Sequence, residues 1–216
     1  LTIEGEVLGE SGDGSAVTAA GTVLDSRGGA VVVTGLAGLA GGDGIDLADS
    51  TLLGSGGSGG TDSITLTGTA RGGSGDEDGV KIESSTITTA GLLTISGTAA
   101  ATGEAVEFDD DQGPDPVIRA NSVHITAQSD DATAFNVDDL ELVADGDVTI
   151  ELQASGADGR AAWLSDSTFA VGGNMTVKGL SGDIAQGGET GVEFENSNVF
   201  LDGALVIKGS GRDEGI

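Results

Sequence analysis

The chain of 216 residues carries 36 acidic and 8 basic side chains, a formal net charge of −28, so we expect it to repel nucleic acid and anionic membrane surfaces. Glycine accounts for 40 residues and aromatic residues for 3%, which disfavours a thick conventional core, yet a hydrophobic content of 37% is too high for a disordered acidic tail. Cysteine is absent, which excludes disulfides, thiolate catalysis and zinc sites of the Cys type.

The first recurring element is an alternating segment of the form apolar-x-apolar-x-small. VVVTG ending at Gly35 and ITLTG ending at Gly68 are typical copies. Successive copies lie about 29 residues apart, a period that is typical of solenoid proteins. The eight copies of this first column end at Gly5, Gly35, Gly68, Gly97, Ala127, Leu152, Gly179 and Gly209.

Two further columns of short alternating segments follow in the repeats. GVKI (79–82) is typical of the second column and STIT (85–88) of the third. Every other residue in them is apolar, which predicts strands with one buried face. The second column comprises residues 44–47, 79–82, 105–108, 134–137, 161–164 and 191–194. The third column comprises residues 22–25, 50–53, 85–88, 117–120, 140–143, 167–170 and 197–200.

Three strands per repeat predict a coil with three sides. In the first column we expect Ile64 and Leu66 to point inward and Thr65 and Thr67 to point outward. Coils of this kind stack about 4.8 Å apart, with each column pairing in parallel with its own copies. The sequence therefore predicts an all-β fold over residues 1–216: one right-handed parallel β-helix, a three-sided solenoid with about 29 residues per coil and about seven coils.

The connections between columns differ in composition. Glycine and asparagine recur where the third column passes to the next copy of the first, as at Gly91 and Asn121, and these residue types accept the positive φ that a sharp corner often needs. The connection from the first to the second column is the longest and most variable. One repeat departs from the others, because DDDQGPDP (109–116) is inserted between the second and third columns and holds both prolines of the chain.

The unit GVKIESSTITTAGLLTISGTA (79–99) resembles the β-strand repeats of giant bacterial surface proteins of the filamentous haemagglutinin-like adhesin type. The resemblance covers essentially the whole chain and concerns pattern and composition. It implies a secreted parallel β-helix that acts as a stalk or fibre in adhesion, biofilm, sheath or surface-layer roles. We therefore expect a bacterial cell-surface or extracellular location, with the secretion signal outside this segment, since no basic-then-apolar leader opens the chain.

The two ends of the chain also bear on its organisation. Leu1 lies inside the first column and Ile216 inside the second, without polar capping coils. Uncapped solenoid ends expose core residues and strand edges. We expect either an internal segment of a longer rod or a subunit that stacks end to end with neighbouring copies of itself. With no run of about 18 apolar residues, we expect no membrane insertion.

Acidic runs in the connections are candidate sites for divalent cations. Calcium takes six to eight oxygen ligands, and loops on consecutive coils bring carboxylates close together. The alternative interpretation of such a charge run is a solvated face. The candidate calcium ligands are Asp76, Asp78, Asp109, Asp110, Asp111 and Asp115.

The sequence predicts no catalytic residue and no cofactor-binding residue. His124 is the only histidine, and we expect it to face outward in a threonine-rich column, which disfavours a Ser-His-Asp arrangement. The absence of tyrosine and the single tryptophan disfavour a polysaccharide-cleaving enzyme.

The expected function is that of a non-enzymatic structural segment of an extracellular fibre or surface adhesin. The alternative is a carbohydrate-active or carbohydrate-binding parallel β-helix.

Overall fold

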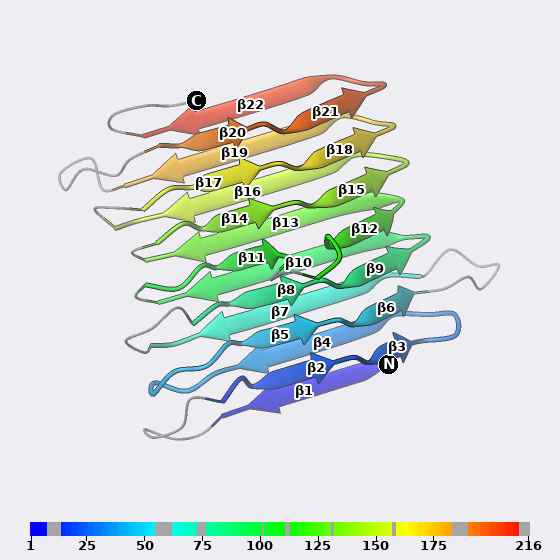
Figure 1. The fold of residues 1–216 in the computed structure, drawn as a ribbon, viewed down its shortest axis with the longest axis vertical. Coiled ribbons are helices and arrows are strands. Elements are labelled where there is room, and N and C mark those ends of the chain that lie inside the picture. Colours follow the sequence, from blue (N-terminus) through cyan, green and yellow to red (C-terminus); the bar gives the residue numbers. More distant parts are fainter. Residues whose placement is uncertain are drawn as a thin grey trace.

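The computed structural model describes residues 1–7, 14–54, 62–72, 77–100, 102–110, 113–130, 132–156, 159–182 and 190–211. These residues form 22 strands and no helix, and the strands lie in three parallel sheets that stack into a solenoid (Figure 1). The predicted all-β fold is confirmed. Within the described ranges, no helix has the length and hydrophobicity that a membrane crossing requires.

Each predicted column forms one sheet. The first sheet contains β1 (Thr2–Glu6), β4 (Val31–Leu36), β7 (Ile64–Ala70), β10 (Leu92–Ala99), β13 (Ser122–Ser129), β16 (Val148–Ala154), β19 (Met175–Ser181) and β22 (Leu205–Ser210). The second sheet contains β2 (Val17–Ala20), β5 (Ile45–Ala48), β8 (Val80–Glu83), β11 (Val106–Asp109), β14 (Phe135–Asp138), β17 (Ala162–Ser165) and β20 (Val192–Glu195). The third sheet contains β3 (Val23–Asp25), β6 (Thr51–Gly54), β9 (Thr86–Thr89), β12 (Val117–Ala120), β15 (Glu141–Ala144), β18 (Thr168–Val171) and β21 (Asn198–Leu201).

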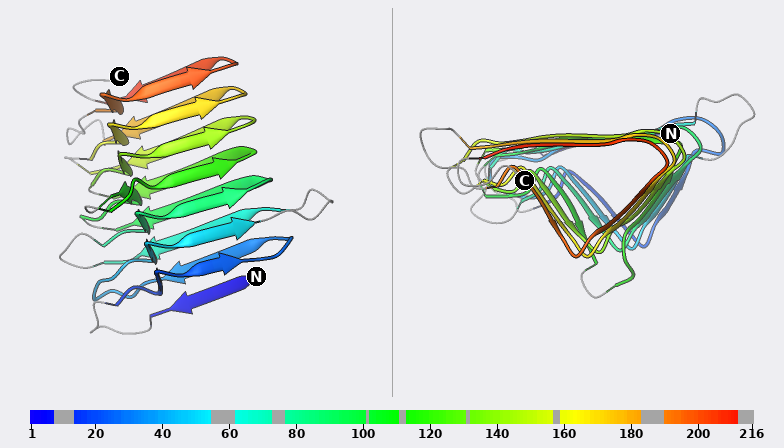
Figure 2. Two further views of the ribbon diagram at one scale, coloured as in Figure 1. Left: turned by 45° about the vertical axis from the view of Figure 1, so that its right-hand side comes forward. Right: turned by 90° about the horizontal axis from the view of Figure 1, so that it is seen from above.

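The chain climbs the solenoid as a right-handed coil. Seen from above, the three sheets trace a triangle, and the chain turns counter-clockwise while it rises toward the viewer (Figure 2). Three corners join the sheets in every coil. We call the connection from the first to the second sheet the first corner, that from the second to the third sheet the second corner, and that from the third back to the first sheet the third corner.

Equivalent residues of successive coils stack in register to form the core. Leu93 lies between Ile64 and Val123, and all three side chains are buried. Where the core contains aromatic rings they also stack, as Phe108 does on Phe135 in an edge-to-face pair with ring centroids 6.0 Å apart. Because every inward column continues from coil to coil, small and branched side chains fill the core and few aromatic residues are needed.

The second corner contains a recurring serine, which is buried in the inner coils and half-buried at Ser197. We call Ser50, Ser85, Ser167 and Ser197 the serine ladder. The Ser85 hydroxyl donates to the Glu83 carbonyl oxygen at 2.7 Å and accepts the Ser50 N–H at 2.9 Å. Ser167 repeats this pattern in a later coil. A hydroxyl both donates and accepts, so one serine hydroxyl bonds a carbonyl oxygen of its own coil and an N–H of the preceding coil.

Among the described residues, a left-handed residue recurs at the second corner, whereas at the third corner positive φ is confined to Arg27, Gly28 and Gly29 of its first connection. Gly91 and Asn121, also at the third corner, do not have positive φ, so the prediction is wrong for these two residues. A Cβ atom at Gly91 would clash with the carbonyl oxygen of Asp62 in the preceding coil; the glycine therefore provides space for close stacking of the backbone. The non-glycine residues with positive φ at the second corner are Asp49, Ser84, Asp139, Asp166 and Asn196.

The insertion within 109–116 leaves the neighbouring strands in register. It follows β11 and precedes β12, and Val117 still pairs with Thr86 on one side and Glu141 on the other. The Asp110 carbonyl oxygen accepts hydrogen bonds from the Ser84 hydroxyl and the Gly113 N–H, both at 2.6 Å. The insertion thus extends the second corner without changing the rise of the coil.

Candidate functional site

The structure separates the predicted calcium ligands into two groups. Asp76 and Asp111 lie outside the described residues. Asp78 lies at the first corner, just before β8, whereas Asp109 is the last residue of β11 at the second corner. Asp110 follows Asp109 and Asp115 is exposed in the inserted segment. The described candidates therefore occupy opposite ends of the second-sheet strands, and they do not form one site.

Carboxylates stack along the solenoid axis at the first corner. The residue two positions before each of the first four second-sheet strands is Ser15, Asp43, Asp78 or Glu104. Asp43 Oδ1 accepts the Asp78 N–H at 2.8 Å, and Asp78 Oδ1 accepts the Glu104 N–H at 2.8 Å. The Ser15 hydroxyl donates to Asp43 Oδ2 at 3.0 Å. Asp43 and Asp78 are thus each tied to the backbone of the next coil.

Asp78 is the centre of a compact group of carboxyl groups. One oxygen of each of Asp78, Glu104 and Glu107 lies within 4.8 Å of the others. Asp78 is only 1% exposed. We call Asp43, Asp78, Glu104 and Glu107 the acidic corner. Asp78 is buried and the two glutamates are half-buried, so three ionised carboxylates at this spacing would repel one another unless a proton or a cation offsets the repulsion.

The protonation of Asp78 follows from these surroundings. Burial is the main cause that raises its pKa to about 10, followed by the charge of Glu107 and the hydrogen bond with its side chain, and then by the charges of Glu104 and Asp43. Asp78 therefore keeps its proton at neutral pH. In that state its hydroxyl donates to Glu107, which offsets part of the repulsion.

Lys81 is a cation beside the acidic corner. Its Nζ lies 2.8 Å from Glu83 Oε1 and 3.4 Å from Glu107 Oε2. Burial lowers the pKa of Lys81, but the hydrogen bond to Glu83 and the charges of Glu107, Glu83 and Asp78 outweigh it and leave the pKa above its ordinary value. Nearby, burial and the charge of Asp43 raise the pKa of Asp46. A single lysine thus leaves the corner with an excess of negative charge.

The acidic corner can bind either a proton or a hard cation. Carboxylate oxygens are the ligands that calcium prefers, and three carboxyl groups supply up to six of them. When Asp78 carries a proton, the Asp78–Glu107 hydrogen bond offsets the repulsion in place of a cation. The two states compete, because the same carboxyl oxygens serve both.

Asp78 was predicted from the sequence, whereas Asp43, Glu104 and Glu107 were not. The prediction rested on acidic residues that are close along the chain, whereas Asp43, Asp78 and the Glu104/Glu107 pair lie on three consecutive coils. A usable signal was present: Asp43, Asp78 and Glu104 occupy the same position relative to the second-column segments. Alignment of the repeats on that column places them in one line.

The second corner has its own acidic surface around the insertion. Asp139 is half-buried, and its pKa is raised first by desolvation and then by the charges of Asp138, Asp115, Asp110 and Asp166. These residues belong to consecutive coils. These side chains are exposed or half-buried, in contrast to the buried Asp78.

His124 lies on the outer face of the first sheet, as expected. It is in register with Thr94 of β10 and Thr149 of β16. Its Nε2 atom is buried and makes no hydrogen bond in the described part of the chain. The threonine-rich column that the sequence predicted around this histidine is therefore present.

The chain matches no protein-family model, no curated protein and no solved structure. The resemblance to filamentous haemagglutinin-like repeats accordingly rests on the sequence pattern. The fold and the arrangement of its side chains are the basis on which a function can be proposed.

Proposed function

We propose that this chain is a non-catalytic structural segment of an extracellular fibre or bacterial surface adhesin, in a stalk, sheath, biofilm-matrix or surface-layer role. The observation that supports this proposal is the unbroken register of the three sheets from β4 to β19. Each coil adds about 4.8 Å to the rod, so the number of coils sets the length of such a spacer. A continuous core then keeps the spacer straight.

The surface charge suits a solvated rod. A net charge of −28 keeps rods apart in solution through mutual repulsion. Ion pairs such as Arg119–Glu141 at 2.8 Å and Lys178–Glu151 at 2.6 Å join neighbouring coils. The few basic side chains thus hold neighbouring coils together along the axis. In this role the chain acts through its shape and spacing.

The outermost described coils fit end-to-end continuation. Ile3 and Leu24 near one end, and Val199 and Ile207 near the other, are only partly buried although they point toward the core. Flanking coils of the same protein, or neighbouring copies, would cover these side chains and pair the free edges of the outer strands. We propose such coils as the partners of this segment.

The enzymatic alternative has less support. A glycosidase needs two carboxyl groups that face a substrate. In the cluster of Asp78, Glu104 and Glu107, the central residue Asp78 is 1% exposed. A sugar chain cannot reach a carboxyl group that is buried to this extent. The burial of Asp78 is therefore better explained by a role within the rod.

Immunogold electron microscopy with an antibody against this chain tests the proposal. We expect label along surface fibres of cells that produce the full protein, and straight rods when the purified chain is imaged. Label confined to the cell interior, or cleavage of a polysaccharide by the purified chain, would contradict it.

A further inference from the structure

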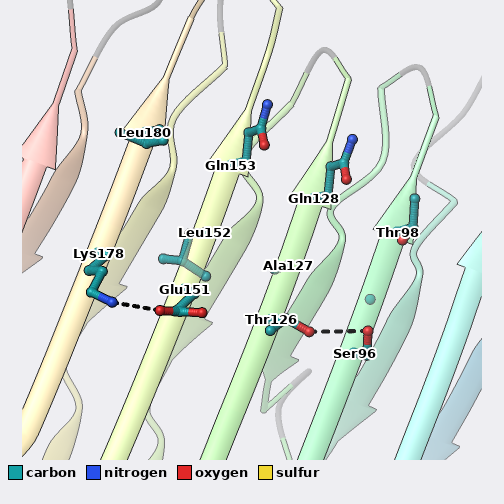
Figure 3. A pocket seen from close by; sticks show the side chains of 11 residues that line it. Ser96, Thr98, Thr126, Ala127, Gln128, Glu151, Leu152, Gln153, Lys178 and Leu180 are labelled. Carbon is teal, nitrogen blue, oxygen red and sulfur yellow. Dashed lines mark hydrogen bonds and ion pairs between the residues drawn. The ribbon is translucent and has the colours of Figure 1, made fainter.

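The outer face of the first sheet contains a groove that runs along the rod. It has a volume of about 390 Å³ and crosses β10, β13, β16 and β19 (Figure 3). The floor of the groove is the backbone of residues whose side chains point into the core. On either side of it lies a column of residues whose side chains point outward. The floor residues are Gly97, Ala127 and Leu152.

The polar side chains of one wall of the groove hydrogen-bond to one another. The Thr126 hydroxyl donates to the Ser96 hydroxyl at 3.1 Å, and Lys178 Nζ donates to Glu151 Oε1 at 2.6 Å (Figure 3). Lys178 also holds the pKa of Glu151 below its ordinary value through this hydrogen bond and its charge. Glu151 therefore stays ionised and paired, and this wall has no net charge.

The opposite wall offers polar groups that no protein group uses. Thr98, Gln128 and Gln153 stand side by side on neighbouring strands and are exposed. Their side chains make no hydrogen bond within the described residues, and the two carboxamides point the same way in Figure 3. Each carboxamide offers two donors and an acceptor. Leu180, which is 58% exposed, continues the column.

The charge of the groove selects among ligands. The chain as a whole carries −28 and repels polyanions, while a polycation is drawn to the acidic corner. The groove itself is neutral and lined by hydroxyl and amide groups. Its complement is a neutral, hydroxyl-rich chain with both donors and acceptors and some apolar surface.

We propose that this groove binds a neutral polysaccharide that lies along the rod axis. The carboxamides of Gln128 and Gln153 hydrogen-bond the hydroxyl groups of successive sugar residues, and Leu180 packs on the C–H face of a sugar ring. Coils rise by about 4.8 Å, a step similar to the advance of one sugar residue in an extended chain. Neighbouring coils thus present equivalent groups to neighbouring sugars. The inference is independent of the fibre role, since a spacer needs no ligand.

Titration of the ¹⁵N-labelled chain with cellohexaose, maltohexaose or laminarihexaose, followed by NMR, tests this inference. We expect at least one of them, at millimolar concentration, to shift the side-chain amide signals of Gln128 and Gln153. An oligogalacturonate and a chitosan oligomer serve as the anionic and cationic comparisons, and they should leave these signals unchanged.

The double variant Q128A/Q153A removes both carboxamides, and we expect it to weaken binding by about ten-fold or more. N198A is the matched control, because Asn198 is an exposed amide on the third sheet; its affinity should equal that of the wild type. The inference is overturned if no neutral oligosaccharide shifts the two glutamine signals, if the shifts map to another face, or if the double variant binds as tightly as N198A.

Discussion

The first and second corners solve the same stacking problem with different side chains. At the second corner, Ser85 accepts a hydrogen bond from the preceding coil and donates one to its own coil. At the first corner, Asp78 accepts a hydrogen bond from Glu104 of the next coil, but it also faces two other carboxyl groups. In a parallel solenoid each residue meets its own equivalent about 4.8 Å away.

This difference shows which polar groups a solenoid can repeat. A serine is its own complement, because a hydroxyl is both donor and acceptor. An ionised carboxylate only accepts, so stacked carboxylates repel one another and require a proton or a cation. The serine ladder is therefore self-sufficient, whereas the acidic corner depends on pH and on ions.

The largest effect is expected from placing a carboxylate in the serine ladder. S85D puts an acid where the side chain is 1% exposed and no cation lies on the ladder. We expect the free energy of unfolding to fall by about 3 kcal/mol or more at pH 7. Thermal unfolding followed by circular dichroism measures this. N198D, at an exposed position, should change stability by less than about 0.5 kcal/mol; equal losses in both variants would refute the argument.

A smaller and opposite effect is expected at the acidic corner. Asp78 has a folded-state pKa of about 10, whereas its pKa in the unfolded chain is near 4. Between these two pH values the folded state holds a proton that the unfolded state has released. The free energy of unfolding therefore falls as pH rises through this range. D78N mimics the protonated form and avoids this loss. We expect it to gain about 1–3 kcal/mol at pH 7.

The pH dependence distinguishes this cause from a general surface-charge effect. The gain of D78N should shrink toward zero as pH falls below about 4, where the unfolded acid is also protonated. D202N, which removes an exposed acid, serves as the control and should show no comparable gain. A D78N variant that is less stable than the wild type at pH 7 would contradict the assignment of the proton.

Calcium is expected to have a more modest effect. If the corner takes up the cation that the sequence predicted, millimolar calcium should raise the melting temperature of the wild type by a few degrees, equivalent to about 1 kcal/mol. D78N should respond less, because it removes a central ligand. An unchanged melting temperature of the wild type would rule out a stabilising calcium site.

The smallest effect is expected at the partly exposed end of the serine ladder. Ser197 makes the same hydrogen bonds as the buried members, including 3.0 Å to the Glu195 carbonyl oxygen, but water can replace them. S197A should cost less than about 0.5 kcal/mol, whereas S85A, which leaves the Ser50 N–H buried without its partner, should cost about 1–3 kcal/mol. Urea unfolding of the two variants compares them; a larger cost for S197A would show that burial does not control the ladder.

Most of the fold was predictable because one rule repeats. Alternation at Ile64 and Leu66, copied about 29 residues later at Leu93 and Ile95, implies both the strands and their pairing, since stacking in register is the arrangement that buries all four. The corner geometry was less accessible. Gly91 was assigned a left-handed conformation from its residue type, whereas the close approach of the preceding coil explains the glycine.

The candidate site was predictable only in part. Asp78 was selected from a local acidic run, but its actual partners, Glu104 and Glu107, belong to the following coil. Asp109 and Asp110 were grouped with it by charge, yet they lie at the other end of the second-sheet strands. Charge runs indicate where acids are dense along the chain; they do not indicate which acids meet across coils.

The sequence by itself determined the repeat, the three strand columns, the inward and outward faces and the acidic surface, because each depends on the order of residues along one coil. The tertiary structure alone decided which polar groups meet. Connections of different lengths end at the same height, so residues 26 to 35 positions apart are brought within hydrogen-bonding distance at the first corner. The buried proton of Asp78 and the neutral groove beside Gln128 both arise from that stacking, since neither the burial of a carboxyl group nor the pairing of Glu151 with Lys178 exists within a single coil.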